Sequence, residues 1–112
     1  MSRLFPVLLA IAVLAGLFAN SVRAEGTEFT LVLRNHQFEP ASLTVPAGQK
    51  ITLIVRNEDA TKEEFESHDL KIEKVVGGKA MIRVMVGPLK PGDYRFVGEY
   101  HEDSAKGVLT AR

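Results

Sequence analysis

The sequence predicts an all-β protein with the architecture of a Greek-key β-sandwich. Apolar and polar residues alternate in short runs along most of the chain, which is the period-two pattern of strands that bury one face. Glycine, proline and asparagine interrupt these runs at short intervals, as turns between strands do. Helical periodicity is nearly absent. Seven or eight short strands at such close spacing are typical of two packed sheets.

The N-terminal segment, residues 1–24, is interpreted as a cleaved signal peptide. Arg3 precedes an apolar run, and Val22 and Ala24 occupy the small-residue positions of a cleavage site. The alternative is an uncleaved membrane anchor, although the apolar run is shorter than the ~20 residues that a spanning helix needs. Cleavage after Ala24 would leave a single domain, residues 25–112, in the periplasm.

Seven runs carry the alternation from which the strands are predicted. In each run the apolar residues recur at every second position, so they would share one face of a strand. Turn residues follow most runs, for example at Pro46-Ala47-Gly48 and at Pro91-Gly92. A polar stretch, residues 57–64, is expected to be mainly a solvated loop. The runs are residues 29–34, 43–45, 51–56, 67–72, 80–86, 94–96 and 108–110.

The inward faces of these strands predict the hydrophobic core. In the run at 67–72, the even-numbered positions are expected to point inward, with Glu66 in register just before them. The expected core residues are Leu31, Leu33, Leu53, Val55, Leu70, Ile82, Val84, Tyr94, Phe96 and Leu109.

Composition and motifs exclude several classes of function. Without Arg3 and Arg23 the 14 basic residues become 12 against 14 acidic ones, a formal charge of −2, so no nucleic-acid partner is expected. The sequence contains no cysteine, which rules out disulfides and thiol chemistry. Sequence motifs of serine hydrolases, phosphate loops, dinucleotide sites and zinc proteases are absent.

The three histidines are the strongest candidates for a site, because each lies at a strand end or in a loop beside acidic residues. Imidazole and carboxylate together suit divalent copper, zinc or iron. Glu66 is favoured because an inward carboxylate needs a charge partner or a metal, whereas Glu63 and Glu64 fit a solvated acidic face equally well. The predicted metal ligands are Glu66, His101, His36, His68, Glu102 and Glu39.

Several segments resemble the cupredoxin-like domains of bacteria, which are small metal-binding β-sandwiches. The resemblance is carried by residues 38–48, by Asn57-Glu58-Asp59 and by a loop from Gly92 to His101 that is similar to the family's metal loop. In that loop the family's cysteine position reads Gly98, and its methionine position reads Ala105 or Lys106. A blue copper site needs a thiolate, so the resemblance implies copper or iron bound without one.

The segment from Glu64 to Leu70 is similar to the cupredoxin component of bacterial iron-uptake systems of the Ftr/Efe type. That resemblance implies a protein that assists the oxidation and uptake of ferrous iron. It also implies two partners, a periplasmic iron-binding protein and a membrane iron permease. In that motif the acidic ligand falls on Glu66 and the loop histidine on His101. Two alternatives remain open: a copper or iron carrier without redox turnover, and a metal-free docking module for a transporter.

Overall fold

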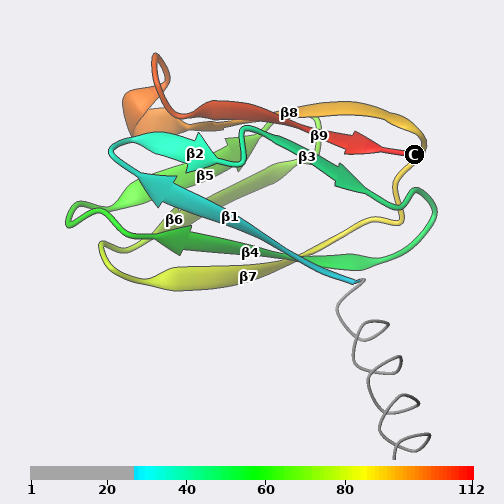
Figure 1. Ribbon diagram of the computed structural model, residues 1–112, viewed down its shortest axis with the longest axis horizontal. Helices are drawn as coiled ribbons and strands as arrows, with labels where there is room; N and C mark the ends of the chain where they lie inside the picture. Colours follow the sequence, from blue (N-terminus) through cyan, green and yellow to red (C-terminus); the bar gives the residue numbers. More distant parts are fainter. Residues whose placement is uncertain (1–26) are drawn as a thin grey trace, which may run out of the picture.

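The computed structural model describes residues 27–112, so the predicted signal peptide lies outside the described residues. Nine strands and one 3-10 turn form two packed sheets within this range (Figure 1), and the prediction of an all-β sandwich is confirmed. The elements are β1 (Glu28–Arg34), β2 (Gln37–Glu39), β3 (Ser42–Val45), β4 (Ile51–Asn57), β5 (Glu63–Ser67), β6 (Ile72–Val76), β7 (Met81–Val86), β8 (Gly92–Gly98), η1 (Glu99–His101) and β9 (Lys106–Ala111).

Both sheets are mixed, and strands distant in sequence lie side by side in each. One sheet has the order β2-β1-β4-β7 and the other has the order β3-β9-β8-β5-β6. The β1–β4 and β3–β9 pairs are parallel, and the remaining pairs are antiparallel. Because the chain passes repeatedly between the two sheets, their inner faces are built together and enclose one core.

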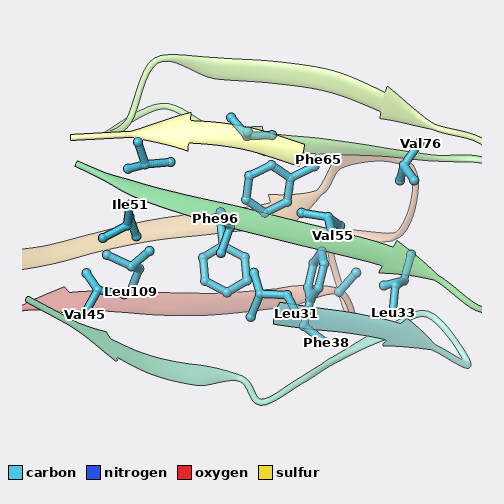
Figure 2. Packing of buried hydrophobic residues seen from close by; sticks show 14 of the residues in the cluster. Leu31, Leu33, Phe38, Val45, Ile51, Val55, Phe65, Val76, Phe96 and Leu109 are labelled. Carbon is cyan, nitrogen blue, oxygen red and sulfur yellow. The ribbon is translucent and has the colours of Figure 1, made fainter. Parts of the chain in front are cut away.

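The core lies between the sheets and contains most of the residues predicted for it. Leu31, Leu33, Leu53, Val55, Val84, Phe96 and Leu109 are buried, while Leu70, Ile82 and Tyr94 are partly buried against them. Three phenylalanines occupy its middle (Figure 2). Phe38 meets Phe96 edge-on at a centroid distance of 5.1 Å and Phe65 at 6.0 Å. Such edge-to-face pairs add roughly 0.5–1.5 kcal/mol to the free energy of burial.

The predicted strand at residues 67–72 is wrong, and the error reverses the assignment of inner and outer faces. The chain instead forms β5, turns at residues 68–71 and returns as β6. Ser67 stabilises the turn, because its Oγ accepts the backbone N–H of Leu70 at 3.0 Å. Lys71 completes it in a left-handed conformation, with a φ of 58°. The inward residues of β5 are therefore the odd-numbered ones, Glu63, Phe65 and Ser67.

Three connections come together at one end of the sandwich. The β1–β2 turn, the β4–β5 loop and the orange η1 segment all lie at the left of Figure 1, whereas the C-terminus lies at the right. Among the described residues, no helix has the length and hydrophobicity needed to cross a membrane. The end that holds η1 carries the candidate site.

Candidate metal centre

Three side chains from different parts of the fold converge at this end of the sandwich. They are His36 from the β1–β2 turn, Glu63 from the first position of β5 and His101 from the last position of η1. Each offers one ligand atom, and these three atoms lie within 4.8 Å of one another. We call this set the His–Glu–His group.

Glu63 is the buried member of the group, with only 1% of its surface exposed. Its Oε1 accepts the backbone N–H of Glu64 at 2.9 Å and that of Tyr100 at 2.8 Å. Its Oε2 lies 2.6 Å from Nδ1 of His101. A buried carboxylate loses several kcal/mol of hydration, and three hydrogen bonds of this kind offset the loss. Both oxygens are thereby fixed in position.

The loop after β8 brings His101 to Glu63. Gly98 ends β8, its N–H donates to the carbonyl of Ala105 at 2.8 Å, and the carbonyl of His101 accepts the N–H of Ala105 at 2.7 Å. A Cβ on Gly98 would lie 2.8 Å from Cδ of Glu63 and 2.8 Å from Cβ of Ala105. The loop therefore reaches its observed position because residue 98 has no side chain.

His36 closes the group from the other sheet. The ring of His36 stacks on the ring of His101 with centroids 3.6 Å apart and planes 13° from parallel. Asn35 and His36 form the two central positions of the β1–β2 hairpin with φ values of 54° and 56°. Asn-Gly is the usual pair in such a turn, and a left-handed conformation costs a residue with a Cβ roughly 1–2 kcal/mol. Such a conformation persists where the surrounding structure holds it, and here the ring of His36 is packed against His101.

The donor atoms of the group decide which cations it suits. Two imidazoles and one carboxylate are typical ligands of Cu²⁺ and Zn²⁺ in proteins. A blue copper centre does not fit, because the chain has no cysteine and the Glu63 carboxylate occupies the space that a side chain at residue 98 would need. The residues fit a divalent cation bound by nitrogen and oxygen.

Glu66 is not part of this group, and its predicted inward orientation is wrong. Because the inward side chains of β5 are odd-numbered, Glu66 lies on the outer face of the sheet. There it approaches three other carboxylates, and the four have ligand oxygens within 4.8 Å of one another. We call this set the acidic cluster: Glu64, Glu66, Glu73 and Glu99.

The carboxylates of the acidic cluster shift one another's pKa values. A hydrogen bond with Glu99, partial loss of hydration and the charges of neighbouring glutamates raise the pKa of Glu64 to about 7. The same causes raise the pKa of Glu66, again with the Glu99 hydrogen bond first. The pKa of Glu99 is lowered, chiefly by its hydrogen bond with Glu64. Like charges at this separation favour protonation of one partner.

The remaining predicted ligands lie outside the His–Glu–His group. His68 is exposed in the β5–β6 turn and lines an open pocket with Glu66. Glu39 pairs with Arg34 at 2.9 Å on β1. Glu102 is exposed directly after η1. Of the six predicted ligands, the His–Glu–His group therefore contains His36 and His101, together with Glu63, which was not predicted.

Glu63 was missed because the strand register was misjudged. Phe65 is the one large apolar residue between residues 61 and 69, and the structure buries it completely. Side chains two positions apart share a face of a strand. The parity set by Phe65 would therefore have placed Glu63 inside and Glu66 outside.

Comparison with known proteins identifies the family of this chain. The family described as Cupredoxin-like domain matches residues 7–111. An uncharacterised protein of Rickettsia prowazekii (strain Madrid E) is 44% identical over 82 residues, which cover 73% of this chain. The match spans 66% of that relative, so this chain covers slightly less than two thirds of the relative's length.

Solved structures show the same fold at low sequence identity. Auracyanin from Roseiflexus castenholzii, in its dithionite-reduced form, has a TM-score of 0.64 at 19% identity, over 77% of this chain and 97% of its own. A purple cupredoxin from Nitrosopumilus maritimus has a TM-score of 0.58 at 15% identity, over 74% and 98%. At such identities the likeness extends to the fold alone.

Proposed function

The chain belongs to the cupredoxin-like domain family, and on that premise we propose that it binds a divalent cation, with Cu²⁺ preferred, through His36, Glu63 and His101. One observation carries the proposal, namely the convergence of the three ligand atoms within 4.8 Å at one end of the sandwich. The three residues come from the β1–β2 turn, from β5 and from η1, so the convergence is a property of the fold and not of local sequence.

The preference for copper follows from the donor set. The affinity of a site with nitrogen and oxygen donors for divalent metal ions rises from Fe²⁺ to Cu²⁺ and falls again at Zn²⁺. Two of the three donors are imidazoles, which suit copper better than a carboxylate-rich set would. A cation here would also replace the His101–Glu63 hydrogen bond with a stronger pairing of the buried charge. Zn²⁺, which takes the same kinds of donor, is the second choice for this group.

We further propose that the protein assists the oxidation and uptake of ferrous iron. This proposal rests on the sequence resemblance of the segment from Glu64 to Leu70. The partners it implies are a periplasmic iron-binding protein and a membrane iron permease, and the expected location is the periplasm. A non-redox copper carrier would use the same ligands. A docking module would not need the His–Glu–His group at all.

Calorimetric titration of the purified protein with Cu²⁺, Zn²⁺ and Fe²⁺ tests the proposal. We expect Cu²⁺ to bind at one equivalent and more tightly than the other two, without the intense colour of a copper–thiolate bond. His101→Ala is expected to abolish this binding. His68→Ala is the matched control, because it removes an exposed histidine outside the group. No saturable copper binding, or equal affinity in His101→Ala, would favour the docking module.

A further inference from the structure

Asp59 directs both of its carboxylate oxygens at the turn that carries His36. Oδ1 accepts the backbone N–H of Asn35 at 2.8 Å, and Oδ2 accepts the backbone N–H of His36 at 3.0 Å. Oδ2 also lies 3.5 Å from Nδ1 of the His36 ring. The carboxylate therefore contacts the backbone of both left-handed residues and faces one edge of the imidazole.

The loop that carries Asp59 is held in place by hydrogen bonds from the side chain of Asn57, which is buried. Asn57 is buried, its Nδ2 donates to the carbonyl of Thr61 at 2.8 Å, and its Oδ1 accepts the N–H of Asp59 at 2.9 Å. The carbonyl of Asp59 accepts the N–H of Lys79 at 2.9 Å. The same loop leads directly into Glu63. It therefore contacts His36 through Asp59 and places Glu63 at the start of β5, so it touches two members of the His–Glu–His group.

We propose that Asp59 is a positioning residue for the His–Glu–His group, which holds the His36 ring over His101 by clamping the β1–β2 turn. The left-handed turn is unfavourable for a histidine, and the two charge-assisted hydrogen bonds from Asp59 hold it in place. The same carboxylate faces Nδ1 of the ring, so Nε2 is the ring nitrogen that remains accessible to a cation. The metal-binding part of this inference rests on the proposed function; the clamping part does not.

Asp59→Asn is the variant that tests the inference. It keeps the size of the side chain but replaces one acceptor oxygen with an NH₂ group, which cannot accept the second backbone N–H. Glu58→Gln is the matched control, because it removes the neighbouring carboxylate, whose partner is Arg34 and not the turn. His36→Ala shows what complete loss of the ring does.

The first measurement uses metal-free protein and NMR of the histidine ring protons. In the wild type and in Glu58→Gln, we expect shifts that reflect the stacking of His36 on His101. In Asp59→Asn these shifts should be lost. Persistence of the stacked shifts in Asp59→Asn would overturn the clamping role, whether or not the protein binds copper.

The second measurement is copper affinity with electron paramagnetic resonance of the Cu²⁺ form. We expect Asp59→Asn to weaken binding about 10- to 100-fold, as loss of a residue that orients a ligand usually does, and to lose the coupling to one of two nitrogens. The double variant with His36→Ala should bind no worse than His36→Ala alone. Additive losses in the double variant, or an unchanged two-nitrogen spectrum in Asp59→Asn, would overturn the inference. Absence of copper binding in the wild type would instead refute the proposed function, and the NMR result would still decide the clamp.

Discussion

The carboxylate of Glu63 fills the space that a side chain at Gly98 would need, at the end of the sandwich that holds η1. A Cβ on Gly98 would lie 2.8 Å from Cδ and 2.9 Å from Oε2 of the Glu63 carboxylate. Real Cβ atoms essentially never approach other atoms that closely. At the position that resembles the family's cysteine, a side chain would therefore collide with the buried carboxylate of Glu63.

This relationship predicts the stability of Gly98→Ala. The added methyl group would collide with Glu63 and Ala105, so we expect the free energy of unfolding to fall by about 1–3 kcal/mol, as overpacking usually costs. In a Glu63→Ala background the same change should cost less, because one of the two obstacles is gone. Denaturant unfolding of the four proteins in the cycle measures this coupling.

Gly77→Ala is the control for that cycle. A Cβ on Gly77 would lie 3.7 Å from Cβ of Ala80, which is an ordinary contact. A Gly77→Ala protein that loses as much stability as Gly98→Ala would show that the collision with Glu63 is not the cause.

Copper affinity should depend on Glu63 and not on Glu66. Glu63→Gln keeps the shape of the side chain but removes the anionic ligand, and we expect it to lower Cu²⁺ affinity at least about tenfold. Glu66→Gln removes a carboxylate of the outer face and should leave the affinity unchanged. Calorimetric titration at constant pH compares the two. The opposite result would mean that the acidic cluster holds the cation.

The acidic cluster predicts the pH dependence of stability. The folded state raises the pKa of Glu64 from 4.5 to about 7, so it binds a proton more tightly than the unfolded state does. The resulting stabilisation is complete when the pH is below the ordinary glutamate pKa of 4.5, and it is lost as the pH rises through about 7. Thermal unfolding between about pH 5 and pH 8 should show a falling melting temperature that is flatter in Glu64→Gln. Parallel curves for the wild type and the variant would refute the raised pKa of Glu64.

Tyr94 predicts a smaller and purely structural effect. Its hydroxyl donates to the carbonyl of Lys90 at 2.7 Å and so ties β8 to the preceding turn. Tyr94→Phe should lower the free energy of unfolding by about 0.5–1.5 kcal/mol, the usual net value of such a bond. Tyr100→Phe is the control, since Tyr100 is 45% exposed. Equal losses of unfolding free energy in the two variants would show that the hydrogen bond of the Tyr94 hydroxyl does not stabilise the fold.

The fold could be predicted from the sequence because apolar and polar residues alternate along most strands, and the apolar positions mark the inner face. Leu31 and Leu33 on β1, and Leu53 and Val55 on β4, are buried as the pattern required. The pattern failed at β5, where Phe65 is flanked by charged and polar residues. There the side chain of Ser67 begins a turn where the alternation suggested a continuing strand.

Two of the three residues of the His–Glu–His group could be predicted from the sequence. Residue type alone pointed to His36 and His101 as ligand candidates. Their contact depends on two left-handed residues, Asn35 and His36, at the tip of a hairpin from the opposite sheet. A sequence shows neither the conformation of that turn nor the position it takes relative to η1. Asp59, which holds the turn, is likewise visible only in three dimensions.

The most direct test of the central claim is the location of copper in crystals of the copper-loaded protein, from anomalous scattering at the copper absorption edge. We expect one strong peak among His36, Glu63 and His101, with ligand atoms at about 2.0–2.2 Å, as nitrogen and oxygen donors give for ions of this size. A peak between Glu64, Glu66, Glu73 and Glu99 instead, with none at the His–Glu–His group, would contradict it.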